Sequence, residues 1–212
     1  MKEKTIWKKN LFVLSIAVFI AGIAFSEIMP FLSLYINTLG NFSHQQLNFW
    51  SGIVYSGTFI VSAVVSPWWG KLADKKGRKP MILRAGIGMS VVIACMGLVQ
   101  NVWQLLLLRM LQGVFAGFIS NSNALVATET PKTNSGQALG TIASAITAGT
   151  LLGPLVGGAL TSIFSYRITF MITGGLLLLC SILVLFFVHE DDFKPVNTKK
   201  LDKASGVIKS LR

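Results

Sequence analysis

The sequence has few charged residues, and acids are the scarcer kind. Charged residues make up 13% of its 212 residues, with 8 Asp and Glu against 19 Lys and Arg, whereas 52% are hydrophobic. Soluble domains carry about 25% charged residues. A chain this apolar cannot cover its surface with polar groups, so a water-soluble domain is excluded. The sequence therefore predicts a protein whose solvent is lipid.

Cysteine and histidine are also rare, which bears on catalysis and metal binding. Cys95 and Cys180 each lie inside an apolar run, and neither has a Cys or His at metal-ligand spacing. His44 and His189 have no catalytic neighbour in the sequence. With no nucleophile–base pair, phosphate loop or metal cluster, we expect no enzyme activity, no metal and no cofactor.

The net charge of +11 would suit a nucleic-acid-binding protein, but the placement of the basic residues does not. They form short clusters between long apolar runs. Such clusters beside apolar runs are typical of membrane topology signals. We therefore expect a lipid bilayer, and no nucleic acid, as the surrounding partner.

Six apolar runs are long enough to cross the hydrocarbon core, which takes about 20 residues each. Helices are required because these runs are too long and continuous for barrel strands. The sequence predicts an all-α integral membrane protein, with a six-helix bundle over 1–190 and a cytoplasmic linker over 191–212. The expected spans are Leu11–Ile36, Phe49–Trp69, Met81–Val99, Val102–Ala127, Ala138–Ile163 and Ile168–Val188.

The distribution of basic residues predicts the orientation. In a six-span topology, 17 of the 19 Lys and Arg lie on the side that holds both termini. Only Arg167 lies on the other side, and Arg109 lies inside the fourth span. Because cytoplasmic loops are rich in Lys and Arg, we expect a multi-pass protein of the cell membrane with both termini in the cytoplasm.

The connection between the second and third spans reads Gly-Lys-Leu-Ala-Asp-Lys-Lys-Gly-Arg-Lys over residues 70–79. Gly70 and Gly77 would permit unusual backbone angles in a tight turn. Asp74 is the only acid there, so we expect it to have a fixed partner. A loop that only sets topology would carry the same basic residues, and this alternative stays open.

The fourth span contains Arg109-Met-Leu-Gln112-Gly113. An arginine within the membrane costs about 2.5–3.5 kcal/mol on insertion scales, so it should face a cavity or a partner. On one continuous helix a small and polar stripe would line a path. Its members are Arg109, Gly113, Ala116, Ser120 and Asn123. The alternative is that Arg109 extends to the membrane interface.

The fifth span repeats glycine every four residues, at Gly149, Gly153 and Gly157, followed by Gly158. Such a row lets another helix approach closely. Pro154 cannot donate a backbone hydrogen bond, so we expect the helix to bend there. Ordinary packing of small residues is the alternative to a moving element.

Glu27 is the only acid within the six spans, and Pro30 should loosen the helix near it. Removal from water disfavours a charged carboxylate, so Glu27 is a candidate for proton exchange and for attracting a lipophilic cation. The alternative is a carboxylate neutralised by a permanent partner such as Arg109.

Three of these segments, in this order and on these spans, resemble the major facilitator superfamily. The loop matches its G-x-L-A-D-x-x-G-R-K pattern, the fourth span its R-x-x-Q-G pattern, and the fifth span the G-x-x-x-G-P-x-x-G-G pattern of drug/proton antiporters. The resemblance covers residues 5–190 and is to the N-terminal six-helix half of a bacterial multidrug efflux transporter.

The resemblance implies a role for each group of residues. A conformational gate would comprise Gly70, Asp74, Gly77, Arg78 and Glu129, with Asp74 meeting a helix N-terminus of the other half and Arg78 pairing with Glu129. Proton coupling and substrate binding would involve Glu27, Arg109, Gln112 and Asn123. The antiporter hinge would comprise Gly149, Gly153, Pro154, Gly157 and Gly158.

The resulting hypothesis is a proton-coupled exporter of amphipathic or cationic drug-like compounds. Few polar side chains line the spans, which suits an amphipathic substrate better than a sugar. The expected partners are lipid, the substrate, protons and a C-terminal six-helix half. The alternatives are a uniporter or symporter of a small metabolite, and a non-transporting truncated membrane subunit.

Overall fold

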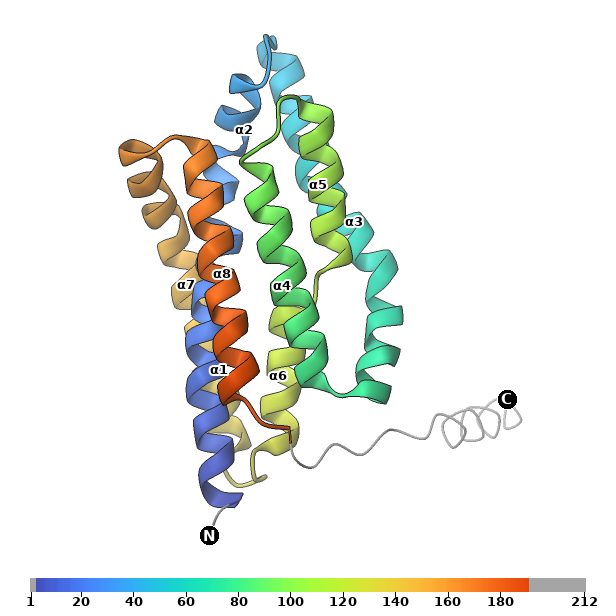
Figure 1. Ribbon diagram of the computed structural model, residues 1–212, viewed down its shortest axis with the longest axis vertical. Coiled ribbons are helices and arrows are strands. Elements are labelled where there is room, and N and C mark those ends of the chain that lie inside the picture. The colour runs from blue at the N-terminus through green and yellow to red at the C-terminus, as the bar shows by residue number, and fades with distance from the viewer. Residues whose placement is uncertain (1–2, 191–212) are drawn as a thin grey trace, which may run out of the picture.

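The computed structural model describes residues 3–190, and this part of the chain forms eight helices (Figure 1). Their bounds are α1 (Glu3–Ser26), α2 (Ile28–Thr38), α3 (His44–Lys76), α4 (Arg78–Met96), α5 (Val102–Val114), α6 (Phe118–Glu129), α7 (Ser135–Ile163) and α8 (Tyr166–Phe187). The predicted linker over 191–212 lies outside the described residues.

The eight helices make six segments that are long and apolar enough to cross a membrane, which confirms the predicted fold class. These segments are Ile6–Thr38, His44–Lys76, Arg78–Met96, Val102–Glu129, Ser135–Ile163 and Tyr166–Phe187. Each predicted span corresponds to one of them. The helix of the third span, α4, ends at Met96, before the predicted end at Val99, because the chain turns at Gly97.

The first span is interrupted at Glu27, between α1 and α2. Pro30 has no backbone N–H to donate to the carbonyl of Ser26, so one helical hydrogen bond is missing at this point. The predicted loosening near Pro30 is confirmed.

The fourth span is interrupted at residues 115–117, and this break was not predicted. Gly117 has φ of 114°, a left-handed conformation that ends the helical path. The expectation of one polar stripe along a continuous helix is therefore wrong. Arg109 and Gly113 of α5 are buried, whereas Ser120 of α6 is exposed.

The ends of the spans alternate between two sides of the bundle. Figure 1 shows the start of α1, the α3–α4 turn, the α6–α7 connection and the end of α8 at the lower side. The α2–α3, α4–α5 and α7–α8 connections lie at the upper side. This is the arrangement that six antiparallel spans require, and it places the described start of α1 and the end of α8 on one side.

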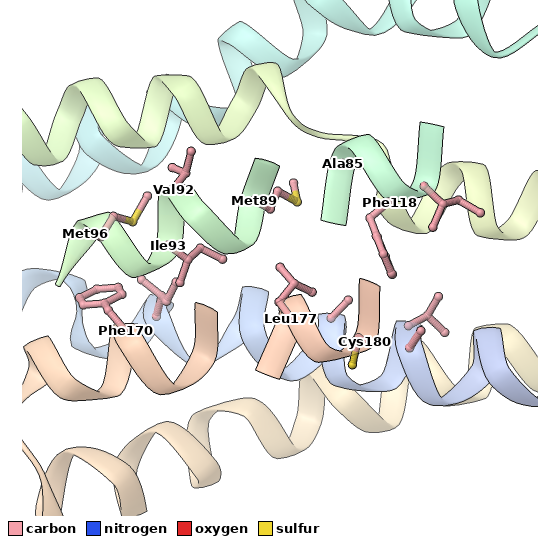
Figure 2. Close-up of a cluster of buried hydrophobic side chains, with 14 of the residues drawn as sticks. Ala85, Met89, Val92, Ile93, Met96, Phe118, Phe170, Leu177 and Cys180 are labelled. Atoms are coloured by element: carbon pink, nitrogen blue, oxygen red, sulfur yellow. The ribbon is translucent and has the colours of Figure 1, made fainter. Parts of the chain in front are cut away.

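The core lies between α4 and α8, with α1 and α6 beside them. Figure 2 shows α4 side chains facing Phe170, Leu177 and Cys180 of α8. Close approach is possible because Gly174 of α8 lies against α4. A Cβ at position 174 would lie 2.7 Å from the Ser90 carbonyl oxygen. In lipid, such close packing stabilises helix association through dispersion contacts.

Two spans remain largely outside this core. Of the most apolar 18-residue stretch of α3, 6% is buried, and the corresponding share of α7 is 17%. The other four spans reach 33–50%. Large apolar side chains such as Phe59 and Trp68 of α3 and Leu151 and Leu155 of α7 are exposed. These two helices therefore present apolar surfaces that lipid or another helical partner can cover.

Candidate functional site

Glu27 lies at the break between α1 and α2 and is 2% exposed. Its Oε1 accepts a hydrogen bond from the Thr173 hydroxyl of α8. The Thr173 hydroxyl also lies 2.9 Å from the Thr169 carbonyl oxygen. One hydroxyl hydrogen thus has two acceptors in reach. A protonated Glu27 can donate to the Thr173 oxygen while Thr173 donates to Thr169, so both protonation states of Glu27 have a hydrogen-bond partner.

A small pocket opens beside Glu27, between the ends of α2, α7 and α8. Four of its eight lining residues are aromatic, and Tyr35 packs against Phe170 with ring centroids 4.9 Å apart. The lining residues are Glu27, Ile28, Phe31, Tyr35, Thr161, Tyr166, Thr169 and Phe170. A carboxylate beside aromatic faces is an arrangement that attracts organic cations. Phe31 and Tyr35 of α2 line this pocket, whereas Phe115 packs over Gly88 of α4.

The glycine row of α7 fits against α1 at the Glu27 break. A Cβ at Gly149 would collide with the Phe19 carbonyl oxygen, and one at Gly153 with the Ser26 hydroxyl. A Cβ at Gly157 would lie 2.9 Å from the Glu27 Cβ. The glycines therefore position the first span and its carboxylate within the six-span bundle.

The close helix contact predicted from this glycine row is made by α1, so the row does not form part of a face that a second half could meet. Gly149, Gly153 and Gly157 are buried, while Pro154 is exposed and Gly158 is partly exposed. The helix α7 runs unbroken through Pro154 from Ser135 to Ile163. The exposed surface of α7 lies on its other side.

Arg109 and Gln112 lie on α5, away from the Glu27 pocket. Arg109 is 7% exposed and donates to Gln112 Oε1 at 3.2 Å. The Arg109 carbonyl accepts from Thr58 of α3 at 3.0 Å. Asn123 is partly exposed on α6, beyond the break.

The structure therefore does not bring the four predicted coupling residues into one pocket. Glu27 bonds Thr173 rather than Arg109. In this conformation Arg109 does not neutralise Glu27, contrary to the alternative considered in the sequence analysis.

Residues 70–79, predicted as a connection, form the end of α3, the turn at Gly77 and the start of α4, and they contain the expected fixed partner of Asp74. Asp74 forms a salt bridge of 2.7 Å with Arg78. Gly77 has φ of 99° between α3 and α4, so its predicted role in the turn is confirmed. Gly70 lies inside the regular helix α3 with open space beside it, so the predicted need for unusual backbone angles there is wrong.

Arg78 makes a different set of contacts from the one expected. Besides Asp74, its guanidinium lies 3.5 Å from Asn121 Oδ1 of α6. Glu129, its expected partner, accepts a hydrogen bond from Asn10 of α1. The Arg78–Glu129 pairing is therefore wrong for this conformation, in which Asn10 ties the end of α6 to α1.

Glu190 contacts this turn and was missed by the sequence analysis. Its Oε1 accepts from the backbone N–H of Arg78 at 2.7 Å, and its Oε2 from that of Lys79 at 2.9 Å. The carboxylate thus caps the N-terminus of α4, where negative charge is stabilised. The sequence contained one signal for this contact: an acidic residue soon after the sixth span, which ends on the same side of the bundle as residues 70–79.

Gly77→Ala is expected to destabilise the protein more than Glu190→Gln. A Cβ at position 77 would lie 2.6 Å from Glu190 Oε2, and the backbone angle adds strain of about 1–3 kcal/mol. Loss of the Glu190 charge removes about 0.3–1 kcal/mol of helix-end stabilisation. Thermal unfolding midpoints of the purified protein measure both effects. Gly70→Ala is the control, and an equal loss at positions 70 and 77 would contradict this account of the turn.

Within residues 3–190, no group of three His, Cys, Asp or Glu side chains is placed to hold a metal ion. Cys95 and Cys180 are free thiols. Glu27 and Arg109 are the buried charged side chains of the described part.

Comparison with known proteins gives the family. The model of the Major Facilitator Superfamily matches residues 14–212. Multidrug resistance protein MdtG of Rahnella sp. (strain Y9602) is 52% identical over 206 residues, which cover 97% of this chain and 50% of that protein. The protein of the same name from Serratia proteamaculans (strain 568) is 50% identical over the same coverage.

A solved structure agrees with this at the level of the fold. The human organic anion transporter MFSD10 (TETRAN) superposes with a TM-score of 0.70 at 19% identity, covering 87% of this chain and 48% of that one. The chain spans about half the length of the relatives it matches. On the family match and this fold, the chain belongs to the major facilitator superfamily.

Proposed function

We propose that this chain is the N-terminal half of a proton-coupled exporter of amphipathic or cationic drug-like compounds. The observation that carries the proposal is the buried Glu27 beside an aromatic pocket, held at a helix break by the glycine row of α7. The multidrug resistance names of the relatives support the substrate class.

Glu27 would exchange its proton for the substrate cation. The two acceptors around the Thr173 hydroxyl support this role, because they accommodate a neutral and a charged carboxyl group. Oε1 of Glu27 is then hydrogen-bonded in either state, whereas leaving a buried polar atom unpaired would cost about 1–3 kcal/mol.

Arg109 and Gln112 would act at a second place in the bundle. Their burial between α5 and α3 supports a part in the conformational change rather than direct contact with a substrate in the Glu27 pocket. Asn123 would face the transport path from α6.

The gate would comprise the Asp74–Arg78 pair, Gly77 and the cap supplied by Glu190, with Glu129 on the neighbouring α6. This cluster lies on the side of both described ends. We place that side in the cytoplasm because 17 of the 19 Lys and Arg are assigned to it. A cysteine that replaces Lys76 should therefore stay unlabelled when an impermeant thiol reagent is added to intact cells. Labelling from outside would contradict this orientation.

Alternating access requires two halves that rock about a site near the membrane midplane. The exposed apolar surfaces of α3 and α7 support a second six-helix half as the partner. The relatives are about twice as long as this chain, which agrees with that arrangement.

Glu27→Gln is expected to abolish pH-driven export of a lipophilic cation, because the variant keeps the shape and loses the titratable charge. Export of neutral substrates should fall less. The measurement is dye efflux from energised cells that contain this chain and a matching C-terminal half, at several external pH values. Thr173→Ser keeps the hydroxyl and is the matched control. Unchanged pH dependence in Glu27→Gln would leave Glu27 with a structural role only.

A further inference from the structure

The break in the fourth span leaves backbone carbonyls without helical partners inside the membrane, where no bulk water can satisfy them. The carbonyl of Val114 accepts from the Trp69 indole N–H at 2.8 Å and from Arg84 Nη1 at 3.3 Å. The carbonyl of Ala116 accepts from Arg84 Nη2 at 2.7 Å. Both carbonyls at the break are thus bonded by side chains from the two neighbouring spans.

Trp69 and Arg84 also contact each other. The Arg84 guanidinium carbon lies 3.6 Å from the centroid of the Trp69 ring, a cation–π arrangement. Within the described residues, Arg84 forms no ion pair. Its charge is therefore held by the two carbonyl dipoles and the ring face rather than by a carboxylate, which fixes the guanidinium at the break.

The helix α4 is shaped to receive the break. A Cβ at Gly88 would collide with the Phe115 ring, and a Cβ at Gly86 would lie 3.0 Å from the Phe118 ring. The aromatic residues that flank the break thus lie over two glycines of α4. The break is packed on α4 by ring contacts and bonded from α3 and α4 by side-chain donors.

The same residues connect the two functional segments described above. Trp69 directly precedes the loop at residues 70–79 that carries the Asp74–Arg78 pair. Val114 directly follows the Arg109–Gly113 segment, and Gly113 itself lies against the Thr58 carbonyl of α3. A movement of the loop end of α3 would therefore reach the break through Trp69.

We propose that Trp69 and Arg84 are positioning residues that set the angle between α5 and α6 and tie the gate loop to the Arg109–Gln112 segment during transport. The transport part of this proposal rests on the proposed function. In this arrangement α5 and α6 move as two separate helices of the fourth span. The bonds from Trp69 and Arg84 to the carbonyls between these helices determine how strongly the two movements are coupled.

The angle is measured with spin labels on cysteines at Leu107 of α5 and Thr128 of α6, both exposed, in a background lacking Cys95 and Cys180. Trp69→Phe keeps a ring and removes the N–H donor, while Arg84→Met removes both guanidinium bonds. We expect the distance distribution between the labels to broaden or shift in both variants. Arg84→Lys should be intermediate, since one ammonium cannot match the guanidinium at both carbonyls.

Trp68→Phe is the matched control, because Trp68 is the neighbouring tryptophan, is 66% exposed and makes no bond to the break. Label-to-label distance distributions identical to wild type in Trp69→Phe and Arg84→Lys would overturn the proposal. These two variants are sufficient for the test if Arg84→Met does not insert into the membrane.

Dye efflux with a matching C-terminal half is measured in parallel. We expect the maximal rate to fall several-fold in Trp69→Phe while the dye concentration at half-maximal rate stays unchanged. A shifted distance with full efflux would overturn the tie to transport. If the parent protein exports nothing while the distances still respond, the proposed function fails and the positioning role stands.

Discussion

The 212-residue chain produced alone is expected to insert into a membrane and to export no dye, whereas a matching C-terminal half produced beside it should restore export. One half can form its own core, because α4, α8, α1 and α6 already bury their apolar faces against one another. Alternating access needs the opposing half. The measurement is dye efflux from energised cells with this chain, the second half, or both.

Surface accessibility supports this expectation. The most apolar stretches of α3 and α7 are the least buried of the six, although their mean hydropathies of 1.5 and 1.6 are close to the 1.6 of the fourth span. Robust efflux by the chain alone would contradict the expectation unless the purified protein were a homodimer. A homodimer would make the chain a complete half-size transporter, in which a second copy covers α3 and α7.

Gly153→Leu is expected to abolish export and to lower the yield of folded protein. Position 153 lies against Ser26 and the backbone of Ile23 and Glu27, so added bulk pushes α1 away from α7 just where Glu27 is held. Overpacking of this kind costs about 1–3 kcal/mol, and more when backbone atoms must move. The measurements are the fluorescence-detected elution profile of the solubilised protein and dye efflux with the second half.

Gly140→Leu on the same helix is the control, because nothing lies within 4 Å of a Cβ at position 140. This variant should keep the wild-type elution profile. A smaller substitution, Gly153→Ala, should give an intermediate loss. Its Cβ meets the Ser26 hydroxyl, which can rotate away, and lies 2.9 Å from the Ile23 carbonyl oxygen, where the backbone must shift slightly. Wild-type behaviour of Gly153→Leu would show that α1 and α7 do not pack as closely as the structure has them.

The six spans could be predicted from the sequence because the membrane imposes a simple condition. Each crossing needs about 20 apolar residues, and the basic clusters mark the ends of the crossings. The turn at Gly77 could also be predicted, because glycine permits the positive φ found there. A partner for Asp74 was expected, but Arg78 was not identified as that partner. Local chemistry alone decides these features.

Features that depend on packing between distant segments could not be predicted. The break at Gly117 is stabilised by Trp69 and Arg84 from other spans, and a single glycine within an apolar run gives no sign of such partners. The cap from Glu190 joins residues more than 100 positions apart. The glycine row of α7 indicated a close helix contact, but the residues themselves did not say that α1 would fill it.

The candidate site shows the same limit. Glu27 could be singled out because an acid within a span is costly and therefore functional by default. Its hydrogen bond to Thr173 and its distance from Arg109 depend on the arrangement of α1, α5 and α8, which neither hydropathy nor motif spacing encodes.

The central claim is that Glu27 exchanges a proton for a cationic substrate. The most direct measurement is proton release on binding of a lipophilic cation to the purified complex of this chain with a matching C-terminal half, in weakly buffered solution with a pH indicator. We predict release that follows substrate occupancy in the wild type and is absent in Glu27→Gln. Equal proton release by the wild type and Glu27→Gln, at equal substrate binding, would contradict the account.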